Sequence, residues 1–458
     1  MELEASIDLP MGIQEHFDIA FGSSAGALII LGLFSNRWPA AECLRQFQSL
    51  STLAFRKRKY FGLPLAPFGK LRGILDFLRG FATDSKYGSD GITAGLISAF
   101  GETQTLFESR CGGAKVAVVA ATTSDSSTCI FSNYNGPERR HSSGYKIVRP
   151  EESRREFSVW QAYFKSFNGY HDGGLGGHNN PIHLALWEQD AIWSREKKEP
   201  DIVLSLGTGY RRAPESESES PRKQSFFRTR CVPRLFRSFL NFFVGETRWQ
   251  ELLMSLAPGV RSRYHRMNIE FFGDEPELDD LQAMPNMLQQ AKFQALSNDD
   301  VRNCADNMLA SLFYIKLNGL PTFDRDLFVC RGQILCRLGP SHQALRPLAA
   351  RMYEASSHFY LAFDQKLPCL DEEDLNSLQY GAPFCCNIIF KVVSLDDFVD
   401  IKIDGITKRP RRISNCPYKI TTLIKDQELD CAFGGRKGRK RMQPDMHQVV
   451  PKRVKFKY

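Results

Sequence analysis

The chain of 458 residues lacks several features that would assign it to a protein class directly. No apolar run reaches the length of a transmembrane helix, and the start, MELEASIDLP, is acidic without the basic region of a signal peptide. The twelve cysteines are scattered, with no CxxC pair and no His/Cys spacing typical of metal ligands. We therefore expect reduced thiols in a cytoplasmic or nuclear protein, with no metal or other cofactor.

Excess positive charge is also absent from most of the chain. Residues 436–458 carry nine Lys/Arg and one acid, which accounts for the whole formal net charge of +8 and leaves residues 1–435 neutral. We expect 436–458 to be a disordered basic tail. Either it is a nuclear import signal or a non-specific contact for polyanions, or it is simply solvated. No specific nucleic-acid site is predicted.

Composition and periodicity divide the chain into segments. Residues 1–210 read as α/β, 211–225 as a polar linker, 226–330 as a mostly helical extension, and 331–435 as a small α+β region. The expected elements of the first segment are strands at 17–21, 115–121, 129–133 and 201–206 and helices at 27–33, 39–55 and 91–100. The run at 115–121 is typical of a buried parallel strand.

One amphipathic helix of the extension has a clear start. Ser297 is the predicted N-cap, because the following apolar residues recur at helical spacing. Its expected buried face consists of Val301, Ala305, Met308, Leu309, Leu312 and Phe313.

The most informative motif is G-x-S-x-G at Gly22-Ser23-Ser24-Ala25-Gly26. It joins an apolar strand directly to an apolar helix, which predicts a nucleophile elbow with Ser24 in a strained backbone conformation. A side chain two residues before or two after the serine is expected to clash, which would explain both glycines. The alternative is an ordinary helix N-cap that contains glycine.

A serine nucleophile needs a base, and the sequence offers an aspartate rather than a histidine. Asp172 precedes Gly173 and Gly174, so a tight turn could aim its carboxylate at a serine hydroxyl. An ordinary Asp-Gly turn is the alternative. His171, His178 and His183 cluster nearby, but we interpret them as loop and helix-surface residues.

Five blocks in this order resemble the patatin-like phospholipases, relatives of plant patatin and of the calcium-independent phospholipases A2. They are FDIAFGSSAG with its helix, WPAAECLRQFQSLSTLAF (38–55), VAVVAATTSD with IFSNYNG (116–136), YHDGGLGGHNNPIHLAL (170–186) and VLSLGTGY (203–210). The layout is similar to that of fungal members.

The resemblance implies a three-layer α/β fold and a Ser–Asp dyad. It makes Ser24 the nucleophile and Asp172 the general base, within the GXSXG motif and the DGA/G-type motif (Asp172, Gly173, Gly174). The implied activity is hydrolysis of an acyl ester of a phospholipid, lysophospholipid or neutral lipid through an acyl-serine, in lipid degradation, without a metal or cofactor.

The resemblance is incomplete at the N-terminal side. The family carries a glycine-rich oxyanion loop before the elbow, whereas Gly12 is the only glycine here before Gly22. The oxyanion would then be held by the Ala25 backbone N–H alone. We expect either a lipid acyl hydrolase given as an incomplete chain, or a catalytically impaired relative that binds lipid or protein.

Residues 222–243 suggest how the protein could meet a lipid surface. Six basic residues and six phenylalanines alternate there without an acid. Such a segment favours anionic membranes, which predicts a peripheral membrane contact. The alternative is an amphipathic helix that packs its rings against the body of the protein.

Overall fold

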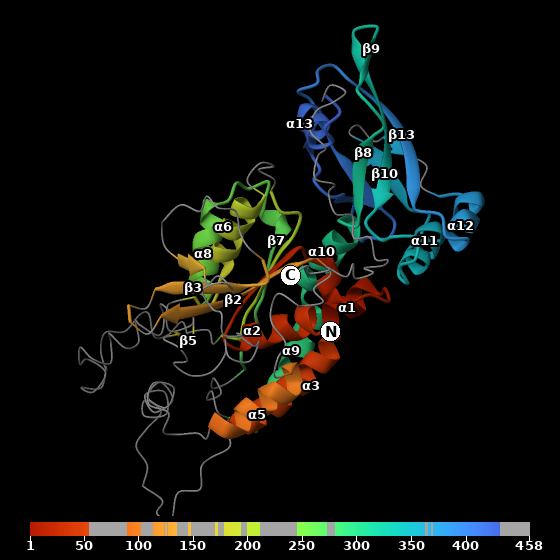
Figure 1. Ribbon diagram of the computed structural model, residues 1–458. Helices are drawn as coiled ribbons and strands as arrows, with labels where there is room; N and C mark the ends of the chain where they lie inside the picture. Colours follow the sequence, from red (N-terminus) through yellow and green to blue (C-terminus); the bar gives the residue numbers. More distant parts are fainter. Residues whose placement is uncertain are drawn as a thin grey trace, which may run out of the picture.

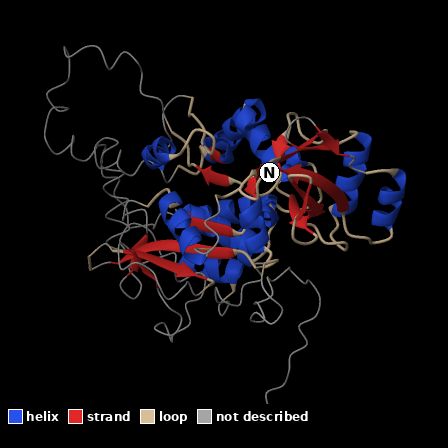
Figure 2. Ribbon diagram, turned by 90° about the horizontal axis from the view of Figure 1, so that it is seen from above, coloured by secondary structure: helices blue, strands red, loops and turns tan. Residues whose placement is uncertain are grey.

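The computed structural model describes residues 1–54, 89–101, 113–122, 124–125, 127–134, 145–147, 170–172, 178–193, 199–210, 245–272, 280–361, 365–367 and 370–430. They fold as mixed helices and sheets of the general α/β class (Figure 1). Strands of both halves are bordered by helices when the molecule is seen from above (Figure 2). The segments 211–225, 226–244 and 436–458, and so the predicted linker, membrane segment and tail, lie outside the described residues.

The N-terminal half contains a five-stranded mixed sheet, here called the motif sheet. Its strands are β1 (Ile19–Ser23), β2 (Lys115–Thr122), β3 (Thr128–Ser132), β4 (Tyr145–Ile147) and β5 (Tyr170–Asp172), in the order β1-β2-β3-β4 with β5 also paired to β2. The buried strand predicted at 115–121 is confirmed as β2. It is parallel to β1 alone and antiparallel to β3 and β5, so the expected parallel environment is only partly correct.

The antiparallel β2–β3 connection has a local cause. Thr122, the last residue of β2, donates its hydroxyl to the Asp125 carboxylate and accepts from the Ser127 backbone N–H at 2.8 Å. Side-chain bonds of this kind stabilise tight turns. The chain therefore reverses at once instead of crossing over through a helix.

Helices cover both faces of the motif sheet. On one face lie α2 (Ala25–Ile30), its π-helical continuation η2 (Leu31–Ser35), α3 (Ala40–Ala54) and α5 (Ser89–Phe100), whose apolar residues pack on Val118, Ala120 and Phe131. On the other face Leu184 of α6 (Ile182–Ile192) packs on Val119 and Ile130. The helices predicted at 27–33, 39–55 and 91–100 are thus confirmed with shifted ends.

A buried polar pair holds α6 to the sheet. The Tyr134 hydroxyl donates to the Glu188 carboxylate at 2.9 Å, and Glu188 is fully buried. A buried carboxylate needs such a donor, because leaving it unpaired costs several kcal/mol, on the order of 2–7 for a polar group.

The strand predicted at 201–206 exists as β6 (Val203–Leu206), but among the described strands it does not pair with the motif sheet. It forms a parallel pair with β7 (Tyr264–Met267), and α8 (Gly245–Ser255) covers the pair through Trp249 and Leu252. Ser205 links this unit to the start of α6, because its hydroxyl donates to Asn180 and accepts from Arg266.

Residues 299–430, here called the C-terminal module, form a second folded region. Its helices are α10 (Asp299–Ala310), α11 (Leu345–Glu354), α12 (Glu372–Gln379) and α13 (Ile420–Asp426). Its strands are β8 (Phe313–Leu317), β9 (Thr322–Asp324), β10 (Leu327–Cys336), β11 (His358–Leu361), β12 (Gln365–Leu367), β13 (Cys385–Val392), β14 (Phe398–Val399), β15 (Ile401–Asp404), β16 (Arg411–Arg412) and β17 (Tyr418–Lys419). They make three sheets, with orders β13-β10-β8 (β9 paired to β10), β12-β11-β15-β16 and β14-β17.

The first residues of the chain pack into this module rather than onto the motif sheet. Helix α1 (Glu2–Ile7) buries Leu3 and Ile7 against α10, in the same apolar cluster as Met308, Phe313 and Phe359. The Arg351 guanidinium of α11 donates to the Ile7 carbonyl at 2.7 Å. The two ends of the described chain therefore share one core.

Two expectations about the second half need correction. Ser297 is the last residue of α9 (Met284–Ser297), and the N-cap of α10 is Asn298, whose side chain accepts from the Asp300 N–H at 2.8 Å. Asn298 can take the N-cap position in place of Ser297, because Asn caps helices as well as Ser does. Leu312 and Phe313 are buried as predicted but lie beyond the helix, which ends at Ala310.

The predicted boundary between the mostly helical extension (226–330) and the α+β region (331–435) falls inside a strand. Residue 330 lies in the middle of β10, which pairs with β8 on one side and β13 on the other. β7, β8 and β9 also lie within the segment expected to be mostly helical. The alternating apolar residues of β8 give no separate strand signal, because they follow the helical pattern of α10 without turn residues between them.

Candidate functional site

Ser24 is the single residue that joins strand β1 to helix α2. β1 ends at Ser23, α2 begins at Ala25, and Ser24 has φ 51° and ψ −127°. A non-glycine residue with positive φ is uncommon, and this ψ lies outside the ordinary left-handed helical region. The strained conformation that the motif predicts is therefore present at the serine itself.

The two glycines of the motif have different roles. A Cβ on Gly22 would lie 2.5 Å from the Gly26 carbonyl oxygen and 2.7 Å from the Ala27 nitrogen, so the tight turn excludes a side chain there. A Cβ on Gly26 would meet nothing within 4 Å, and the expectation that this position also needs glycine for lack of space is wrong. The asymmetry arises because α2 turns its backbone over Gly22, whereas Gly26 lies on an open side of the helix.

The two serines of the motif also differ. Ser23 is buried, and its hydroxyl has no hydrogen-bond partner among the residues that the structure describes. Ser24 is half-buried at the start of α2. The first hydrogen bond of the helix runs from Ala27 N to Ser24 O at 2.9 Å, so the N–H groups of Ala25 and Gly26 precede the helical ladder. Such donors can face a negative charge that develops beside the serine.

Strand register places Asp172 close to Ser24 in the fold. On β2, Val119 pairs with Ser23 of β1, and the next residue, Ala120, pairs with Asp172 of β5. β3 occupies the other edge of β2 across Ala120 and Ala121, so β5 lies on the same edge as β1. Because β1 is parallel and β5 antiparallel to β2, their carboxyl ends meet along that edge. The backbones of residues 24 and 172, 148 positions apart, are thereby brought together.

The rest of the second motif is described only in part. Gly173 and Gly174 lie outside the described residues. His171 pairs with Ala121 in β5, and His183 lies in α6. His178 is half-buried, and its Nε2 lies 2.7 Å from the Thr128 hydroxyl at the start of β3. Burial, with Arg248 and His183 nearby, lowers the pKa of His178, which favours a neutral ring.

The residues before β1 show no glycine-rich loop. They form α1 and the short 3-10 turn η1 (Ile13–His16), and His16 and Phe17 lead directly into β1. Among the described residues, the backbone donors beside Ser24 are those at the start of α2.

The chain matches no protein-family model, and no curated protein matches it.

Two general properties bear on the surroundings of the site. Across the described part of the chain, no helix is long and apolar enough to cross a membrane, and no group of three His, Cys, Asp or Glu side chains is arranged to hold a metal. The eight cysteines that the structure describes are free thiols.

Proposed function

We propose that the chain is a serine ester hydrolase of the patatin-like type that acts on lipid acyl esters, with Ser24 as nucleophile and Asp172 as general base. The observation that carries this proposal is the backbone of Ser24, a non-glycine residue held at φ 51° between a strand and a helix. Strain of this kind is kept where it exposes a reactive group.

Two further observations support the proposal. The register of β1 and β5 on β2 brings residue 172 to the serine, as a dyad requires. Helices on both faces of the motif sheet agree with the three-layer arrangement of the patatin-like fold. The five ordered sequence blocks name the family, and the strand register is independent of that resemblance.

The chemistry follows from these positions. The Ser24 oxygen attacks the ester carbonyl while the Asp172 carboxylate accepts the hydroxyl proton. The negative charge on the former carbonyl oxygen faces the Ala25 N–H at the start of α2. The alcohol leaves with the proton from Asp172, and an acyl-serine remains. Water, deprotonated by Asp172, then attacks the acyl carbon. The bond to the Ser24 oxygen breaks, this oxygen takes the proton back from Asp172, and the fatty acid is released.

A second function is favoured by the segment before β1. In place of a glycine loop it forms α1, which is packed into the C-terminal module. Loss of one oxyanion donor lowers turnover by about 10²–10³. The alternative is therefore a catalytically impaired patatin-like protein that binds lipid or a protein partner, and we expect weak esterase activity from residues 1–458.

The decisive experiment is covalent labelling of the full chain with a fluorophosphonate, followed by peptide mass spectrometry. We expect label on Ser24, none in Ser24→Ala, and labelling slower by roughly 10²–10⁴ in Asp172→Asn. Ser23→Ala is the matched control, because it removes a neighbouring buried hydroxyl and should label like the wild type.

The outcomes separate the alternatives. Label on Ser24 with slow hydrolysis of a short-chain nitrophenyl ester supports an impaired hydrolase, whereas rapid hydrolysis that depends on Ser24 supports a competent one. Absence of label from Ser24, or equal labelling of Ser24→Ala, rejects the nucleophile.

A further inference from the structure

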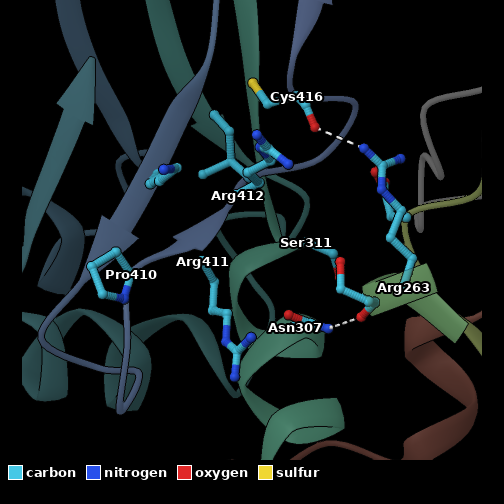
Figure 3. Close-up of a pocket in the computed structure, with 11 residues that line it drawn as sticks. Arg263, Asn307, Ser311, Pro410, Arg411, Arg412 and Cys416 are labelled. Atoms are coloured by element: carbon cyan, nitrogen blue, oxygen red, sulfur yellow. Dashed lines mark hydrogen bonds between the residues drawn. The ribbon is translucent and has the colours of Figure 1, made fainter. Parts of the chain in front are cut away.

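A pocket of about 250 Å³ lies far along the chain from the motif sheet, where the β6–β7 pair meets the C-terminal module. Its walls come from four places, which are the loop before β6, the turn η5 (Arg261–Arg263), helix α10, and the strands β15 and β16 (Figure 3). Four basic side chains line it, namely Arg263, Lys402, Arg411 and Arg412. Of the described residues that line it, one is acidic, Asp201.

The acid offsets only part of this charge. Asp201 accepts hydrogen bonds from the Ser414 hydroxyl at 2.6 Å and from the Asn415 N–H at 2.7 Å. Arg263 is held by backbone carbonyls instead of an acid, donating to Pro200 at 3.3 Å and to Cys416 at 2.9 Å; the bond to Cys416 is drawn in Figure 3. Four basic groups and one carboxylate give the lining a formal charge of +3, while Asp400 and Asp306, which are not part of the lining, lie beside Arg412 and Arg411.

Two strands place like charges directly opposite each other at this pocket. Lys402 of β15 is the register partner of Arg412 of β16. Like charges at such a position are destabilising unless an anion lies between or beside them. Arg412 is paired with Asp400 through Nε and Nη2, at 2.9 and 3.0 Å. The Lys402 ammonium has no hydrogen bond or ion pair to any residue that the structure describes.

Arg411 does not share this face of the strand. Successive side chains of a strand point to opposite faces, and Figure 3 shows Arg411 directed toward α10, away from Arg412. Its Nη2 bonds the Asn303 amide and lies 3.8 Å from Asp306, and its Nε is buried without a hydrogen-bond partner among the described residues. The free donor of the pocket is therefore the Lys402 ammonium.

We propose that this pocket binds a phosphate group, as a phosphate ester small enough for the cavity. Lys402 supplies the free donor, and Arg412 and Arg263 add positive charge. A phosphate dianion fits better than a carboxylate, because it carries two charges and accepts hydrogen bonds from several directions at once. The proposal does not depend on the esterase, since it concerns residues of the C-terminal module and the β6–β7 pair.

The phosphate could belong to a soluble ester or to a lipid head group, and the two sources are separated by the choice of probe. Inorganic phosphate and glycerol 3-phosphate are titrated into the full chain by calorimetry. Co-sedimentation with phosphatidylcholine vesicles, with and without phosphatidic acid, tests the lipid source. All titrations are repeated at raised salt, which should weaken binding.

The test variant is Lys402→Gln, with Lys391→Gln as matched control. Lys391 is also a strand lysine, on β13, but it is exposed and lies outside the pocket. We expect saturable binding of at least one probe, weakened roughly tenfold or more in Lys402→Gln and unchanged in Lys391→Gln.

Each result bears on the proposal directly. Binding of the soluble probes with these losses supports a soluble ester, and binding only of phosphatidic acid vesicles with the same losses supports a lipid head group. Absence of saturable binding to every probe, or equal binding by folded Lys402→Gln and wild type, overturns the proposal. Thermal unfolding of each variant shows that it is folded.

Discussion

The motif sheet and the C-terminal module differ both in what their sequences display and in how their cores are built. The motif sheet and the helices on its faces carry four of the five blocks of the family resemblance, and the fifth lies on β6. The buried residues of the motif sheet fall into small clusters on its two faces. The module carries no motif, yet its buried residues form one large continuous cluster that also takes in α1. In Figure 1 the strands of the module lie apart from the motif sheet, and α10 and α1 lie between the two sets of strands.

This difference suggests a division of roles. The motif sheet holds a strained serine, and strain is tolerated only where surrounding structure over-determines it. The module supplies packing, since its large core buries the most apolar surface. Changes in the module should therefore alter stability, and changes at the elbow should alter chemistry, with the junction between them responding to pH.

The largest expected effect is on the module core. Phe313 is fully buried and lies edge-on to Phe359 and Phe384, with ring centroids 5.4 and 5.2 Å away. Phe313→Ala should lower the free energy of unfolding by about 3–5 kcal/mol. Urea unfolding measures it, with Phe323→Ala as control, because Phe323 is 64% exposed and its loss should change stability by about 0.5 kcal/mol or less. Similar losses in both variants would contradict the assignment of the core.

Two glycine substitutions at the nucleophile elbow are expected to have opposite effects. Gly22→Ala forces a Cβ against the Gly26 carbonyl and should cost about 1–3 kcal/mol and abolish labelling of Ser24. Gly26→Ala has open space in a helix and should be neutral or stabilising by about 0.4–1 kcal/mol, with labelling retained. Thermal unfolding and fluorophosphonate labelling of the two proteins give the comparison. Equal behaviour would mean that the turn is not as tight as the structure shows.

The junction between the two regions should respond to acid through His16. Burial, with a smaller contribution from Arg337, lowers the pKa of His16 from 6.5 to about 4, and neither ring nitrogen has a partner among the described residues. Between these values the unfolded chain binds a proton that the folded chain does not, so stability falls as pH falls. The expected loss is about 2 kcal/mol from pH 7 to pH 5.

His16→Phe removes this titration and should flatten the pH dependence by that amount. Urea unfolding at pH 7, 6 and 5 measures it, above the range in which carboxylates titrate. His265 is also buried with a pKa of about 4, so some slope should remain in the variant. The same slope in both proteins would show that His16 becomes accessible before it is protonated.

The smallest effect is expected at the exposed contact between the regions. Arg337 follows β10 and lies 2.7 Å from the Asp18 carboxylate beside β1, with 36% and 65% of the side chains exposed. A double-mutant cycle with Arg337→Ala and Asp18→Ala should give a coupling energy of about 0–1 kcal/mol, reduced by salt. A coupling well above this range would mean that the ion pair, rather than the α1 packing, joins the two regions.

Local features of the fold followed from the sequence. The strands at β2 and β3, the helices α3 and α5, and the strained serine were all predictable, because apolar periodicity and glycine positions depend on neighbouring residues. The prediction failed where the signal was not local. Asn298 replaced Ser297 as a cap because two good capping residues are adjacent, and only the course of the chain selects one.

The pairing of distant segments was decided by the tertiary structure alone. Nothing in the composition shows that α1 packs on α10, that β6 pairs with β7 instead of the motif sheet, or that Lys402 faces Arg412 beside Arg263. The sequence by itself identified the two candidate residues, since Ser24 and Asp172 stand in recognisable motifs. That they meet on one edge of β2 depends on strand register, a long-range property that is set by packing and that no short stretch of sequence encodes.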